Sequence, residues 1–75
     1  MNWREYISVD PNVMHGVACI AGTRIPVSLA LDNLAARTPE ERLLTEYPSL
    51  TPDAIQAALM YAAELAREQN IALPV

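Results

Sequence analysis

Two side chains able to do nucleophilic or metal chemistry lie close together in the sequence, His15 and Cys19. A thiolate beside an imidazole can attack a carbonyl, and both side chains are common zinc ligands. The chain has one cysteine and one histidine, whereas a structural zinc site needs four ligands, so only a site shared by two copies remains. We therefore interpret Cys19 as a small apolar residue of a strand, and we expect no metal or other cofactor.

Adjacent carboxylates at Glu40 and Glu41 are the second candidate, since paired acids can exchange protons with a substrate. Their context favours a structural explanation. Thr38 and Pro39 precede them, and a threonine followed three residues later by a glutamate is typical of a capping box at a helix start. A chain of 75 residues also offers little room for a catalytic cleft. We expect that the protein is not an enzyme.

The first 27 residues contain both glycines and are predicted to form a β segment. Apolar and polar residues alternate over 7–10, which is the period of a strand. Short apolar or β-branched runs at 18–20 and 23–25 flank Ala21-Gly22, which predicts a small hairpin with a two-residue loop. Pro26 is expected to end this hairpin, because proline cannot donate to a sheet.

Three helices are predicted over 28–69, where no glycine occurs. Ser28 is the expected cap of the first helix. Thr38 and Thr51, each followed by proline, are the expected caps of the second and third. The third helix is expected to run from Pro52 to about Gln69. Its predicted buried stripe consists of Ile55, Ala58, Leu59, Ala62, Leu65 and Ala66, with Asp53, Ala57, Glu64, Arg67 and Glu68 largely outside it.

The order of these elements predicts a mainly α fold: a three-helix helix-turn-helix, homeodomain-like domain with a short N-terminal β-hairpin or strand segment. Residues 1–75 are expected to form one domain, made of the β segment 1–27, the helices 28–69 and a tail 70–75. The apolar end of the tail, 71–75, is expected to fold back or fray, with docking in a partner's groove as the alternative. With no membrane-spanning run and no secretion signal in the sequence, a cytoplasmic location without membrane contact is expected.

Charge limits the partners that this chain can have. All five cations are arginines, the net charge is −4, and residues 38–75 carry the whole acidic excess. DNA binding needs clustered cations, so binding by this chain alone is expected to be weak and sensitive to salt. The candidate nucleic-acid contacts lie around the predicted helix-turn-helix and are Arg37, Arg42, Thr51 and Gln56. Asp53 would repel phosphate there, and an ordinary solvated position is the alternative for Gln56.

A second set of residues, in the N-terminal segment, is expected to contact a second copy or another partner: Trp3, Ile7, Val9, Arg24 and Ile25. Trp3 either anchors the N-terminus or lies in a dimer interface, and the predicted strand offers a pairing edge. Arg24 can bind a carboxylate or a phosphate through its planar fork, or pair within the chain with an acid such as Asp32. A homodimer is expected, because association would help so small a core.

The run 19–27, which reads CIAGTRIPV, resembles the domain-of-unknown-function 433 family of small bacterial proteins. Four further stretches agree with that family's pattern, namely 7–11, 15–16, 47–51 and 57–62. The resemblance implies a helix-turn-helix fold with a β segment, often dimeric, and an antitoxin role similar to VapB-type antitoxins. The chain departs from the family at Val17-Ala18, where Lys or Gln followed by Pro is common, which removes a positive charge and a rigid turn.

These observations together predict an interaction protein. The resemblance implies an antitoxin that binds and masks a small PIN-like nuclease toxin and, as a dimer, represses its own operon. Carboxylates of the acidic half, Glu64 and Glu68 among them, are expected to oppose the basic surface that a ribonuclease uses for RNA. Two alternatives stay open: a stand-alone DNA-binding transcriptional regulator, and a dimeric structural or assembly module that binds no nucleic acid.

Overall fold

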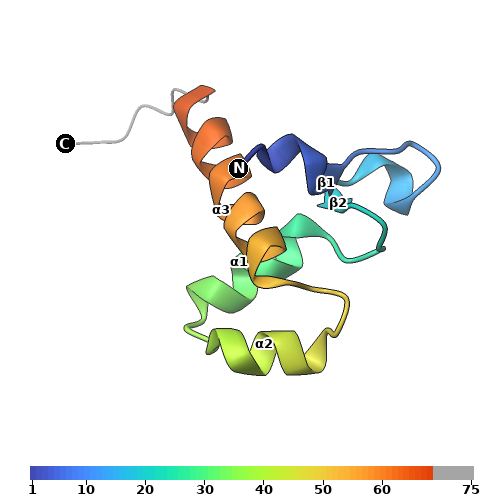
Figure 1. Ribbon diagram of the computed structural model, residues 1–75. Helices are drawn as coiled ribbons and strands as arrows, with labels where there is room; N and C mark the ends of the chain where they lie inside the picture. The colour runs from blue at the N-terminus through green and yellow to red at the C-terminus, as the bar shows by residue number, and fades with distance from the viewer. Residues whose placement is uncertain (69–75) are drawn as a thin grey trace.

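The computed structural model describes residues 1–68, and three helices make up most of it (Figure 1). They are α1 (Val27–Ala35), α2 (Glu40–Glu46) and α3 (Pro52–Glu68). Ahead of them lie two short 3-10 helices and two short strands, η1 (Trp3–Glu5), β1 (Ile7–Ser8), η2 (Met14–Gly16) and β2 (Cys19–Ile20). The predicted mainly α fold with a short N-terminal β segment is confirmed. The predicted tail, 70–75, lies outside the described residues, and within 1–68 no helix has the length and apolar run that a bilayer crossing requires.

The sheet is one antiparallel pair of strands, with Ile7 opposite Ile20 and Ser8 opposite Cys19. The predicted hairpin is therefore not the main pairing, because β2 forms its ladder with β1 and meets the residues after Gly22 only through a single bridge. The strand predicted over the alternating N-terminal residues does form, in a shorter version. The pairing with β1 brings the N-terminal segment onto the helices, which the local bridge alone would not do.

A tight turn follows β2. The Thr23 amide and hydroxyl both donate to the Ile20 carbonyl, at 3.0 and 2.8 Å. The chain then returns along the other edge of β2 through a single bridge, in which Cys19 lies opposite Pro26 and the Ile20 amide donates to the Ile25 carbonyl. Pro26 fits this position because the bridge requires no N–H from it. The direction of the predicted hairpin is thus correct, although its register is not.

The cap of α1 lies two residues before the predicted cap, Ser28. Pro26 takes the cap position in an extended conformation, and its carbonyl accepts the Leu29 N–H at 3.0 Å. Ser28 therefore lies inside the first turn and caps nothing, so its predicted role is wrong. The cause is the bridge to β2, which already holds Pro26 in the extended conformation that precedes a helix.

Of the two predicted threonine caps, one forms. Thr51 accepts the Ala54 N–H at 3.1 Å through its hydroxyl, as an N-cap does. Thr38 instead donates its hydroxyl to Oδ1 of Asn33 at 3.3 Å, and Pro39 precedes α2 without a side-chain hydrogen bond. The predicted capping box is wrong, because α2 begins at Glu40 with Pro39 at the cap position, one residue later than a Thr38 cap requires.

The core gathers residues of β2, of all three helices and of the connection between α2 and α3, each less than 5% exposed: Ile20, Val27, Ala30, Leu43, Leu50, Ala54, Ile55 and Ala58. On α3 the buried face is rotated away from the predicted stripe. Ala57, predicted outside the stripe, is fully buried, whereas Leu59 and Leu65, predicted inside it, are 44% and 37% exposed. Ile55 lies on both the predicted and the observed face.

The N-terminal segment explains this rotation. η1 packs against α3, and the ring of Trp3 lies 5.3 Å from the ring of Tyr61, centroid to centroid. Figure 1 shows the N-terminus beside the middle of α3. The Arg4 guanidinium lies 4.4 Å above the Trp3 ring, at the range of a cation–π contact. Apolar spacing along one helix cannot register a contact made by the opposite end of the chain.

Candidate partner-binding surface

The helix α2 buries one leucine and turns its polar side chains outward. Leu43 has no exposed surface and joins α2 to the core. The exposed positions include three acids, one arginine and one threonine: Glu40, Glu41, Arg42, Thr45 and Glu46. Acidic residues in the first turn are favourable because the N-terminus of a helix carries partial positive charge. The same arrangement that stabilises this short helix makes its outer surface acidic.

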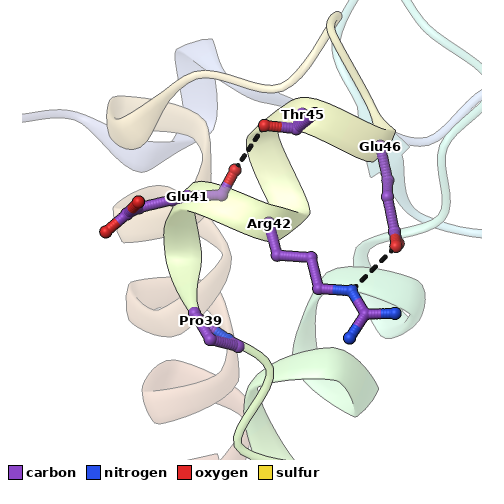
Figure 2. A pocket seen from close by; sticks show the side chains of 5 residues that line it. All are labelled: Pro39, Glu41, Arg42, Thr45 and Glu46. Carbon is purple, nitrogen blue, oxygen red and sulfur yellow. Dashed lines mark hydrogen bonds and ion pairs between the residues drawn. The ribbon is translucent and has the colours of Figure 1, made fainter.

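Figure 2 shows the hollow on this surface, with side chains from Pro39 to Glu46 around it. Nε of Arg42 donates to Oε1 of Glu46 at 3.0 Å, one helical turn away. The Thr45 hydroxyl donates to the Glu41 carbonyl at 2.8 Å and so points back onto the helix. The Glu41 carboxylate extends away from this network, without a partner among those drawn. The hollow is open to solvent. Beside it, Arg42 is paired with Glu46, whereas the Glu41 carboxylate has no partner among the side chains drawn.

The first turns of α3 carry the other predicted contacts. Asp53 and Gln56 are exposed, and the Thr51 hydroxyl is engaged in the cap of the helix. Ala57 is fully buried, so it has no surface to offer a base edge. Counting α2 and the first turn of α3 together, four exposed acids (Glu40, Glu41, Glu46 and Asp53) stand against Arg42, a net charge of −3.

Arg37 lies in the connection between α1 and α2, in the left-handed region with φ of +63°. Its amide donates to the Leu34 carbonyl at 3.0 Å, and the Thr38 amide donates to the Asn33 carbonyl at 2.9 Å. This pair of bonds is a Schellman motif, which closes a helix and usually has glycine at the left-handed position. The Arg37 side chain is exposed. The structure therefore places this candidate on the surface, at some backbone strain.

Three of the five N-terminal candidates contact the chain's own core. Trp3 is half-buried against Tyr61, and Ile7 and Ile25 are half-buried hydrophobics packed on the core cluster. Trp3 thus contacts α3 of its own chain and keeps part of its surface exposed. Replacing Ile25 by a charged residue would consequently disturb folding as well as any interface.

The other two N-terminal candidates are free at the surface. Val9 is 62% exposed, which is high for a branched apolar residue. Arg24 is exposed and lines a shallow groove with Asp10 and Thr23. Within residues 1–68, no ion pair joins Arg24 to Asp32, so the predicted alternative of an internal pair is wrong. One acid, Asp10, and one base, Arg24, line this groove, so its charges balance.

Glu64 is partly engaged within the chain. Its Oε2 accepts a hydrogen bond from Nη2 of Arg67 at 2.6 Å, one turn along α3. That hydrogen bond, and then the charge of Arg67, hold the pKa of the Glu64 carboxyl below its usual value, with a smaller contribution from Arg4. A carboxylate already paired in this way has less to offer a basic partner than Glu40 or Glu41.

Comparison with known protein families matches residues 7–62 to the family described as Protein of unknown function (DUF433). The chain belongs to this family. The predicted family resemblance is confirmed, and the match covers β1, β2, α1, α2 and more than half of α3. The family description states no activity, so membership of DUF433 assigns no function to these surfaces.

Two proteins similar to this DUF433 chain also have names that state no activity. It is 36% identical over 59 residues to "Uncharacterized protein y4eO" from Sinorhizobium fredii, a match that covers 79% of this chain and 27% of that protein. It also matches the crystal structure of a DUF433 member protein from Anabaena variabilis, with a TM-score of 0.75 and 33% identity over 84% of this chain and 62% of that one. The chain thus spans about a quarter of the curated relative and less than two thirds of the solved one.

The two residues considered first for chemistry lie in different environments. Cys19 is 1% exposed, and its thiol donates to the Val17 carbonyl at 3.3 Å, whereas His15 is exposed in η2. Within residues 1–68, no three side chains of His, Cys, Asp or Glu lie close enough together to hold a metal ion. Their positions offer no thiolate–imidazole pair and no ligand cluster.

Sequence reasoning missed the left-handed backbone at Met14, His15 and Arg37, with φ of +51°, +56° and +63°. For Arg37 a signal was present. Pro39 stands two residues further on, and prolines are common just after the left-handed residue that closes a helix. For Met14 and His15 the only hint was Gly16, which continues the left-handed run with φ of +82°.

Proposed function

We propose that this chain is an antitoxin-like binding protein that masks a basic partner, a small nuclease toxin, with the acidic surface of α2 and the first turn of α3. The observation that carries the proposal is the net charge of −3 on that surface, where Glu40 and Glu41 extend into solvent. A nuclease binds its nucleic acid through clustered cations, so a surface of this sign complements it. Masking requires no chemistry from the masking chain.

The same charges argue against DNA as the ligand of this chain alone. Of the predicted nucleic-acid contacts, Arg42 is paired with Glu46, and the Thr51 hydroxyl is engaged in the helix cap. Asp53 lies three residues before Gln56 at the start of α3, where a helix-turn-helix protein meets the duplex, and its charge repels phosphate. Repression of an operon would then depend on cations supplied by the partner.

The test is co-purification of the tagged chain from the host at moderate salt, followed by identification of a stoichiometric partner. The masking proposal requires that this partner be basic, and that its cleavage of a labelled RNA stop when the chain is added in equimolar amount. It also requires binding to weaken as salt rises, because screening reduces the attraction between opposite charges. A partner that keeps its nuclease activity in the complex refutes masking.

Two pairs of variants locate the surface. The double variant Glu40→Gln and Glu41→Gln is expected to weaken partner binding at least tenfold. The matched control is the double variant Glu64→Gln and Glu68→Gln, which removes the same number of negative charges from the end of α3. It is expected to change binding less than threefold, because Glu64 is already paired with Arg67. Equal loss from both pairs would show a general effect of net charge, and loss from the second pair alone would move the contact to α3.

A gel shift with duplex DNA carrying the operator region tests the alternative regulator. We expect no retardation at physiological salt by the isolated chain. Retardation that is lost in the combined variant Arg42→Ala and Gln56→Ala would instead identify the chain as a stand-alone DNA-binding regulator.

A further inference from the structure

Two turns that are separate in the sequence form the walls of one groove. One wall is the turn after β1, with Asp10 and Val13, and the other is the turn after β2, which contributes residues 22–24. Ser8 of β1 completes the lining. The pairing of β1 with β2 brings the two walls to one place, since both turns are attached to that small sheet. The groove is therefore a product of the fold and of no single stretch of sequence.

Each wall is fixed by hydrogen bonds of its own. Beside β1, Oδ1 of Asp10 accepts the Asn12 N–H at 2.9 Å. Beside β2, the Thr23 hydroxyl donates to the Ile20 carbonyl at 2.8 Å and accepts the Ile25 N–H at 3.0 Å. Turns closed by side-chain hydrogen bonds of this kind hold the local backbone in a defined shape. The charged side chain on each wall thus extends from a fixed backbone position.

Asp10 and Arg24 line this groove with opposite charges and do not pair with each other. Both residues are exposed, and the ion pairs among residues 1–68 involve other side chains. Asp10 holds one carboxylate oxygen in its turn, which leaves the other oxygen for a cation. The Arg24 guanidinium makes no hydrogen bond within residues 1–68. The groove therefore offers one negative and one positive group to a partner.

We propose that this groove selects the partner, by binding a peptide segment of the masked nuclease that carries a cation for Asp10 and a carboxylate for Arg24. The inference rests on the masking proposal and adds to it the contact that gives specificity. The acidic surface of α2 attracts any basic protein and does not choose among them. The groove adds no net charge, but a segment with its two charges exchanged would place like charges together at both positions.

The side chains of the groove suit a peptide segment. The planar guanidinium of Arg24 can donate two parallel hydrogen bonds to one carboxylate, which fixes the orientation of that carboxylate. Val13 is half-buried and lines the same groove, so it offers apolar surface to the rest of the segment. A bound segment would thus meet a cation, an anion and an apolar contact in one arrangement.

Calorimetry with the purified partner from the co-purification tests this selection. The double variant Asp10→Asn and Arg24→Gln removes one charge of each sign, so the net charge stays at −4, and the asparagine keeps an oxygen for the turn. We expect the partner to bind about tenfold more weakly, the loss of two exposed charge pairs. The matched control is Arg67→Gln with Glu68→Gln, which also leaves the net charge unchanged and should bind within about threefold of the parent chain.

Binding of cytochrome c, an unrelated basic protein, is the second readout. It should bind the parent chain and the double variant equally at low salt, because the attraction comes from the acidic surface of α2. Arg24→Gln alone removes a side chain without a hydrogen bond within residues 1–68, so it tests the groove even if the double variant fails to fold, with an expected loss of about threefold.

The outcomes separate this inference from the masking proposal. A partner that is masked equally well by the parent chain and by the groove variants overturns the groove and leaves masking standing. Equal losses for the partner and for cytochrome c also overturn it, since the groove would then select nothing. A co-purification that yields no basic nuclease refutes masking itself and the selection that rests on it.

Discussion

Replacing Arg37 by glycine is expected to make this protein more stable. Arg37 occupies the left-handed position of the Schellman motif that ends α1, with φ of +63°. For a residue with a Cβ atom the left-handed conformation costs about 1–2 kcal/mol, because Cβ approaches the following carbonyl oxygen. Glycine has no such penalty, although its greater freedom in the unfolded chain offsets about 0.5–1 kcal/mol of the gain.

The net gain for Arg37→Gly is therefore about 1 kcal/mol, which corresponds to a rise in Tm of about 4–8 °C for a domain of this size. Arg37→Ala is the matched control, since it also removes the exposed guanidinium and its charge but keeps Cβ. We expect its free energy of unfolding to stay within about 0.5 kcal/mol of the parent chain. Urea unfolding followed by circular dichroism measures both variants under the same conditions.

The comparison between the two variants separates backbone strain from side-chain contacts. If Arg37→Gly and Arg37→Ala shift the unfolding midpoint equally, the reasoning from φ is refuted, and any change belongs to the lost charge. If strain is confirmed, the arginine is held at this position against its conformational preference. Binding of the partner by Arg37→Gly then tells whether its guanidinium contributes to a contact.

Two further predictions concern α3. Thr51→Ala should lower the free energy of unfolding by about 1 kcal/mol, because it removes the hydroxyl that accepts the Ala54 N–H and caps α3. Thr38→Ala, at a threonine that caps no helix, should lower it by less than half as much; urea unfolding measures both. The Glu64 carboxyl should titrate below its usual pKa in an NMR pH series, and Arg67→Gln should raise it. Because the pKa of Glu64 is lower in the folded than in the unfolded chain, the Glu64–Arg67 pair stabilises the folded state at pH values above the unfolded-state pKa. This contribution is lost as the pH falls through the folded-state pKa.

The helix boundaries could be predicted from local chemistry where nothing else competed for the capping groups. At Thr51 the threonine, proline and carboxylate occur in the expected order, and the hydroxyl accepts the expected amide. The same three residue types stand at Thr38, and there the cap fails, because the helix begins one residue later, with Pro39 at the cap position, and the Thr38 hydroxyl donates to Asn33 of the preceding helix instead. Capping signatures describe one helix start and carry no information on side chains that arrive from a neighbouring helix.

The buried face of α3 could not be predicted for a related reason. Apolar residues occupy most of the circumference of α3, so the sequence alone does not tell whether Ala57 or Leu59 faces the core. Contact with η1 decides between them, and Trp3 reaches Tyr61 from the other end of the sequence. The groove lined by Asp10 and Arg24 has the same origin: the sequence pattern predicts a strand and a turn there, but only the pairing of β1 with β2 brings the two walls together.

A three-helix outline of this kind is compatible with DNA binding and with protein binding, so the decision lies in the charges that the outline carries. On the surface of α2 and the first turn of α3, the one cation is paired and the acids Glu40, Glu41 and Asp53 have no ion-pair partner within residues 1–68. Each phosphate contact of a DNA-binding protein releases counterions through a cation, and this surface offers one cation, Arg42, against four acids. For a basic protein the same acids are favourable contacts, whose strength falls with salt in proportion to their exposure. Under the masking proposal, the same acidic excess would both disfavour nucleic acid as a ligand and let the chain compete with nucleic acid for a nuclease.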